Sequence, residues 1–355
     1  MGGLSNKCYA KVGLNYELPC VIMFGIAFML VFAGFDTQAY ITETALQSVS
    51  IAFPGRISPH AGYYGMSITY LSFTISTFIT PLVLSYLSAK WTMFLASVLY
   101  TTFMITFMFV NNYMFYIASA LLGIAAALIW TGHGVYMKEI TTSGNESRNS
   151  GLHWGITFAG LLFGGILLLV VFNRTGETET ISMELIRYIF GGLSTFTILS
   201  NILFALLPNR CNRSTTKRDS FATTIGKSVK LLGDIKLYLL AICFMFMGLS
   251  LSFYITIYPS CLSFSKSVIG FGNEIIAYYA FITSASQIFA FPKSANLRPT
   301  NDATYLSPSL AVWLIIGMLI CIGDSCWNTL RTAVLTKMYH HESSSQAFAL
   351  SKFFR

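Results

Sequence analysis

The sequence predicts an all-α protein, a polytopic bundle of transmembrane helices. Of its 355 residues, 54% are hydrophobic and only 10% are charged, against about 25% charged in an ordinary soluble domain. The mean hydropathy is +0.63. The apolar residues extend from Pro19 to the C-terminus rather than forming core stripes. There is too little charge to cover a soluble surface, so a membrane-embedded unit is predicted.

Each expected helix is a run of about 20 mostly apolar residues, the length that crosses the hydrocarbon core of a bilayer. The first run follows a polar lead and has no small-residue cleavage site after it, so we expect it to remain as a helix. The tail SQAFALSKFFR begins a further apolar pattern. The nine predicted spans are near 19–45, 62–87, 91–110, 113–137, 151–172, 185–207, 237–259, 271–291 and 308–335.

The distribution of Lys and Arg predicts the orientation. With the N-terminus in the cytosol, four of these residues fall outside, namely Arg56, Arg174, Arg187 and Lys266. Twelve fall inside through the eighth span. Since cytosolic loops carry the excess of Lys and Arg, a cytosolic N-terminus is predicted. The net charge of +8 therefore indicates membrane orientation rather than nucleic-acid binding.

A strongly basic polar stretch predicts the division into domains. We expect an N-terminal six-helix bundle over 1–207, a basic cytosolic linker over 208–236 and an incomplete C-terminal bundle over 237–355. Contact of this linker with anionic lipid or a partner is the weaker alternative to a role in orientation. Two six-helix halves joined by a linker are the layout of the major facilitator type.

A faint internal repeat agrees with this layout. GIAAALIWTGHGVYM from Gly123 resembles GMLICIGDSCWNTLR from Gly317. The offset between these segments is 194 residues, whereas the first and seventh spans are offset by 218. The difference is about one membrane span. We therefore expect about nine spans plus the start of another, with one helix of the second half absent.

Four polar residues at membrane depth are candidates for lining a cleft between the halves. Asp36 and Gln38 lie in FAGFDTQAY, and Asp324 and Asn328 lie in IGDSCWNT. Ionisable groups in the membrane usually face a cavity or a partner. Hydrogen bonding between helices explains the two carboxylates equally well, and a proton-coupling role is less favoured because no basic partner is evident.

A small-residue face on the fifth span predicts close helix packing rather than ligand binding. Glycine on one face lets a neighbouring helix approach. The residues are Gly151, Gly155, Gly160 and Gly164.

Catalytic, metal and cofactor sites are not predicted. His133 and His153 lie in different spans without a ligand spacing, and His340 and His341 lack the spacing of a zinc helix. The seven cysteines contain no CxxC pair. No nucleophile elbow, Walker loop or HExxH motif occurs. We expect neither an enzyme nor a resident cofactor.

The orientation separates three N-x-S/T sequons. Asn145 and Asn212 fall on the cytosolic side, and only Asn173 is expected to face the lumen. Asn173 is therefore the one predicted glycosylation site.

Several uncommon blocks carry a family resemblance. GIAAALIWTGHG, SRNSGLHWGITFAGLLFGG, IGDSCWNT and SSQAFALSKFF, together with GYYGMSITYLSF from Gly62, resemble in order the uncoordinated-93-like (Unc-93) family of the major facilitator superfamily. The similarity is greatest to its orphan major-facilitator-domain-containing branch. The loop LSYLSAKWT lacks the Gly-x-x-x-Asp-Arg pattern of sugar and drug carriers. The family layout has about twelve helices.

The resemblance implies a non-enzymatic regulatory or trafficking partner of other membrane proteins. The family precedents are regulation of a potassium channel and escort of receptors to endosomes. A secondary solute transporter is the alternative. The expected partners are the lipid bilayer and a client such as a potassium channel, without nucleic acid. The resemblance leaves open whether the membrane is the plasma membrane or an endosomal one.

Overall fold

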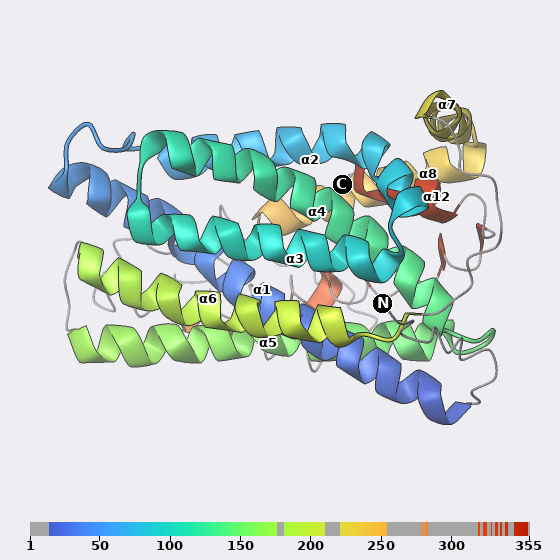
Figure 1. Cartoon of the computed structure of the whole chain (residues 1–355), viewed down its shortest axis with the longest axis horizontal. Coiled ribbons are helices and arrows are strands. Elements are labelled where there is room, and N and C mark those ends of the chain that lie inside the picture. Colours follow the sequence, from blue (N-terminus) through green and yellow to red (C-terminus); the bar gives the residue numbers. More distant parts are fainter. Residues whose placement is uncertain are drawn as a thin grey trace, which may run out of the picture.

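The fold is an antiparallel bundle of long helices (Figure 1). The computed structural model describes residues 14–175, 181–209, 221–253 and 344–353, together with separate positions between 278 and 339. All regular elements in these residues are helical. The predicted all-α fold class is confirmed.

Six helices are long and apolar enough to cross a membrane in the described part of the chain. They correspond to the first six predicted spans, with shifted ends. The first helix continues seven residues past the predicted end at 45, through LQSVSIA. The six are α1 (Leu14–Ala52), α2 (Ala61–Tyr86), α3 (Ala89–Thr106, continued by the 3₁₀ turn η1, Phe107–Phe109), α4 (Asn112–Ile140), α5 (Glu146–Thr175) and α6 (Met183–Leu206).

Three further helices are α7 (Phe221–Leu232), α8 (Ile235–Ser252) and α12 (Ser344–Phe353). The seventh predicted span corresponds to α8, whereas most of the eighth and ninth lies outside the described residues. The stretch expected to be a linker contains α7. Its apolar residues Phe221, Ile225 and Val229 recur every four positions, and this helical spacing was available in the sequence.

Side-chain caps fix where several helices begin. Asn111 accepts a hydrogen bond from Tyr113 N at 3.0 Å at the start of α4. Ser182 accepts one from Leu185 N at 3.2 Å before α6. Such caps satisfy backbone N–H groups that lack an intrahelical partner.

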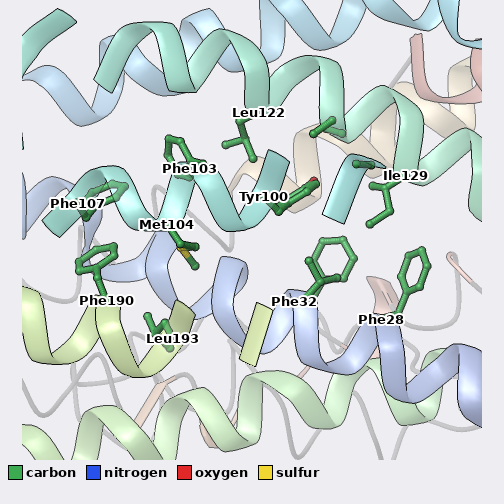
Figure 2. Packing of buried hydrophobic residues seen from close by; sticks show 14 of the residues in the cluster. Phe28, Phe32, Tyr100, Phe103, Met104, Phe107, Leu122, Ile129, Phe190 and Leu193 are labelled. Carbon is green, nitrogen blue, oxygen red and sulfur yellow. The ribbon is translucent and has the colours of Figure 1, made fainter. Parts of the chain in front are cut away.

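The core lies where α1, α3, α4 and α6 meet (Figure 2). Phe107 of η1 and Phe190 of α6 stack with ring centroids 4.1 Å apart and planes 4° apart. Phe32 of α1 approaches Tyr100 of α3 edge-on at 6.1 Å. Figure 2 shows these rings pointing toward one another between the helices. Interlocked aromatic rings of this kind fix the relative positions of the helices.

Two glycines allow α5 to lie directly against α1. A β-carbon at Gly160 would overlap the carbonyl oxygen of Met29 and lie 3.0 Å from the amide nitrogen of Ala33. A β-carbon at Gly164 would overlap the side chain of Thr37 and lie 2.9 Å from the carbonyl oxygen of Ala33. These contacts support the proposed packing role of the glycine face, which also includes Gly151 and Gly155.

Each of the six long helices has one terminus at the end of the bundle where Lys90, Lys138 and Arg148 lie. We call this the basic end. A buried carboxylate joins two segments at this end. Glu17 of α1 accepts hydrogen bonds from Thr142 N at 3.2 Å and Thr142 Oγ1 at 2.7 Å, and another from Asn149 Nδ2. The start of α1 is thereby fixed to the α4–α5 connection.

Glycosylation mapping tests the predicted orientation. We expect modification at Asn173, near the end of α5, and none at Asn145 or Asn212. Asn145 lies at the basic end, where its amide contacts Thr142 and Glu17 at 3.0 and 3.4 Å. Expression in microsomes, followed by glycosidase digestion, should show one mass shift that Asn173→Gln removes. Modification at Asn212 would contradict the orientation.

Candidate ligand site between the two halves

The segment α12 lies against α2 and α4 near the basic end (Figure 1). It belongs to the predicted C-terminal half, so these contacts join the halves. The ring of Phe348 lies so close to Gly134 of α4 that a β-carbon there would overlap it. Phe353 meets Phe78 of α2 edge-on, with centroids 4.9 Å apart.

Tyr339 links three parts of the chain. Its carbonyl accepts a hydrogen bond from Lys138 Nζ at the end of α4. Its hydroxyl donates to Asp234 Oδ2 at 3.1 Å, and Asp234 caps α8. Burial and the bond to Asp234 raise the pKa of Tyr339 to about 12. The hydroxyl therefore stays protonated over the physiological pH range, and the link does not depend on pH there.

An aromatic cluster surrounds two buried histidines from α4 and α5. The rings of His133 and His153 have centroids 4.6 Å apart. Phe24 of α1 stacks on His153 at 4.5 Å and on His133 at 5.4 Å. Trp130 and Trp154 stack on each other at 5.7 Å. We call these five residues and Phe28, whose ring lies 5.0 Å from both imidazoles, the His–Trp cluster.

Three polar atoms of the His–Trp cluster have no hydrogen-bond partner among the residues that the structure describes. They are His133 Nε2, His153 Nδ1 and Trp154 Nε1. The three residues are 2%, 0% and 3% exposed. Buried polar groups in proteins are almost always paired, so each of these atoms calls for an explanation.

Cationic side chains from the second half approach this cluster. Lys352 Nζ of α12 lies 4.0 Å from the centroid of the Trp130 ring, in a cation–π contact. Lys352 and Arg331 are both buried and both act electrostatically on His133. The cluster therefore lies in a positive environment at the contact between the halves.

The structure places Asp36 and Gln38 on α1, eight and ten residues after Phe28 of the His–Trp cluster. Asp36 is half-buried, and its charge acts on Tyr100 of α3. Gln38 is buried, and its Nε2 donates to Thr42 Oγ1 one turn later. Their predicted role in lining a cleft stays a proposal.

Asp324 and Asn328 form a buried pair. Asn328 Nδ2 donates to Asp324 Oδ2 at 2.8 Å and to the Asp324 carbonyl at 3.0 Å. Both residues share one buried helical stripe with Arg331 and Thr332. The pair comes shortly before Arg331 in the chain. The positive charge of Arg331 acts on His133.

The His–Trp cluster was not predicted from the sequence. His133 and His153 lie on separate helices and have no ligand spacing, so only the tertiary arrangement, in which α4 and α5 both contact α1, brings them together. The available signal was local, since each histidine has a tryptophan within three positions in WTGH and HW. Across the described positions, no group of three or more His, Cys, Asp or Glu side chains could hold a metal ion.

Solved structures show the class of fold. The proton:xylose symporter XylE gives a TM-score of 0.65 at 13% identity, over 96% of this chain and 86% of that one. FucP in an outward conformation gives 0.62 at 12% identity, over 96% and 88%. At this identity the likeness shows the fold alone, and the protein is a multi-pass membrane protein with the major facilitator fold.

Comparison of the sequence with known families defines the protein more narrowly than its fold does. The model of the family "Ion channel regulatory protein UNC-93" matches residues 53–290 and 288–355, and the chain belongs to this family. UNC93-like protein MFSD11 of Xenopus laevis is 26% identical over 396 aligned residues, covering 95% of this chain and 87% of the relative. UNC93-like protein 3 of Arabidopsis thaliana is 21% identical, covering 98% and 78%. The family resemblance predicted from the sequence is confirmed.

Proposed function

We propose that this protein is a non-enzymatic regulatory or trafficking partner of another membrane protein, with an ion channel as the client. The family description, that of an ion channel regulatory protein, supports the class of client. A potassium channel is the client that the sequence resemblance implies.

The proposed regulation depends on the contact between the halves at the basic end. Lys138, Tyr339 and Asp234 connect the end of α4 to the start of α8. Contacts of this kind can break and re-form, and that would give the halves two arrangements. A client that binds one arrangement better shifts the equilibrium between the two arrangements. Because such coupling is reciprocal, the arrangement of the halves also shifts the conformational equilibrium of the client.

Co-expression with potassium-channel subunits in oocytes tests this proposal. We expect the channel's open–closed equilibrium to shift about fivefold or more, as ordinary allosteric coupling does, or its surface amount to change if the role is in trafficking. The Tyr339→Phe variant removes only the hydroxyl that reaches Asp234, so it should weaken the effect while the protein still reaches the membrane. Unchanged current and unchanged surface amount across the channel subunits would contradict the proposal.

Solute transport is the second candidate, and the buried ionisable residues favour it. Asp324, Arg331 and Lys352 are 5%, 6% and 5% exposed, and such groups in membrane proteins commonly mark substrate or ion pathways. In reconstituted vesicles, a proton-coupled carrier should lose coupled uptake with Asp36→Asn or Asp324→Asn. A regulator should keep its client binding with both variants.

A further inference from the structure

The unpartnered atoms of the His–Trp cluster come from two helices. His133 Nε2 comes from α4, and His153 Nδ1 and Trp154 Nε1 come from α5. The two imidazole rings are in contact, and the Trp154 ring lies 5.5 Å from His133 and 5.8 Å from His153. The three side chains are therefore neighbours, and each of these atoms costs stability while it lacks a partner.

The surrounding rings restrict the size of this molecule. Phe24 and Phe28 cover the imidazoles from α1, with centroid distances between 4.5 and 5.4 Å. Trp130 lies 6.0 Å from His133. Rings packed so closely exclude a ligand of more than a few atoms.

The charges around the histidines determine whether an anionic or a cationic ligand is favoured. Lys352 and Arg331 act on His133, and both are cations. Glu17, Lys138 and Asp324 have hydrogen-bond partners of their own, namely Thr142 and Asn149, the Tyr339 carbonyl, and Asn328. The charges that act on His133 are instead those of Lys352 and Arg331. Phe24 and Phe28 supply no charge from α1. A cation would be repelled here, and an anion would be attracted.

The contact with Thr157 determines which atom of His153 can accept a proton. The Thr157 hydroxyl donates to the His153 carbonyl at 2.9 Å, and its oxygen lies 3.5 Å from His153 Nε2. In the tautomer protonated at Nε2, this nitrogen faces an acceptor and Nδ1 carries the lone pair. Protonation at Nδ1 would turn that atom into a second donor.

We propose that His133, His153 and Trp154 form a binding site for a small monovalent carboxylate, which enters together with one proton. The proton goes to an imidazole nitrogen, with His153 Nδ1 the best placed, and the carboxylate accepts hydrogen bonds from that N–H and from Trp154 Nε1–H. Proton and carboxylate add no net charge. Protonation without the anion would place a third cation beside Lys352 and Arg331, so the two bind together.

This site does not depend on the proposed function, because either a regulator or a carrier can hold a ligand between its halves. Binding is therefore measured directly, by calorimetry on the full chain in lipid nanodiscs with sulfate as the only background anion. Acetate and propionate are the probes, and chloride is the comparison. We expect carboxylate affinity to rise about tenfold for each pH unit lowered between pH 7.5 and 5.5.

Matched variants locate the site. His153→Gln and His133→Gln should weaken carboxylate binding and flatten its pH dependence. Trp154→Phe removes the N–H donor together with part of the ring, and it should weaken binding and keep the pH dependence. The controls are His60→Gln, since the His60 side chain is 65% exposed, and Trp91→Phe, since Trp91 is 44% exposed. Both should bind as the parent does.

Proton uptake gives the second measurement. Calorimetry in buffers of different ionisation enthalpy should show about one proton taken up with each carboxylate. The proposal is overturned if the parent binds neither carboxylate at pH 5.5, if binding is independent of pH, or if both histidine variants bind normally. Chloride binding with the same affinity and pH dependence would overturn the carboxylate class.

Discussion

Replacing Gly160 or Gly164 by leucine is expected to prevent α5 from packing on α1. At both positions even a β-carbon would overlap α1, at the Met29 carbonyl or the Thr37 side chain. Alanine should lower the free energy of unfolding by ~1–3 kcal/mol, as overpacking does in other cores. Leucine should cost more, so little monodisperse protein should survive size-exclusion chromatography in detergent.

Gly192 of α6 provides the control for this experiment. A β-carbon there would lie 3.5 Å from the Leu167 side chain, which is ordinary contact. The Gly192→Ala variant should melt like the parent, whereas Gly160→Ala and Gly164→Ala should melt at lower temperature. If all three alanine variants melt alike, the close approach of α5 to α1 is wrong.

Glu17→Ala is expected to destabilise the basic end by about 1–3 kcal/mol, because the buried Asn149 amide loses an acceptor. The two donors of Thr142 lose the same acceptor, but Thr142 is exposed and water can replace it there. The carboxylate is 4% exposed and serves Thr142 N, Thr142 Oγ1 and Asn149 Nδ2. The start of α1 would then separate more easily from the α4–α5 connection. Thermal melting measures the loss, and limited proteolysis should find faster cleavage between α4 and α5.

The matched control is Glu184→Ala, at the first turn of α6. Glu184 is exposed, and its contribution is limited to the favourable charge near a helix N-terminus, which is less than about 1 kcal/mol. Equal melting temperatures and equal cleavage rates for the Glu17 and Glu184 variants would show that the Glu17 contacts do not stabilise the fold.

The six long helices could be predicted from the sequence because a bilayer imposes one requirement on every span. Each must bury its backbone in a helix of about 20 apolar residues, so composition alone locates α1 to α6. The helix α7 was missed because it follows another rule. It is short and amphipathic, and its apolar positions are separated by polar ones such as Lys227 and Lys230.

For the candidate site, the sequence relates residues only where they are neighbours along one helix. Asp324 and Asn328 are four residues apart, so a helix brings them together, and the structure shows them bonded. The contact of His133 with His153 depends on the relative positions of two helices. Lys352 reaches Trp130 from the other half. Hydropathy and periodicity describe one helix at a time and carry no information on such contacts.

The contact of Gly134 with Phe348 has a consequence for the evolution of the family. Bulk at one position excludes bulk at the other, because a β-carbon at Gly134 would overlap the Phe348 ring. Relatives with a larger residue at the position of Gly134 should carry a smaller one at that of Phe348. The two positions then vary as a compensating pair, and natural sequences would contain a distance restraint between the halves.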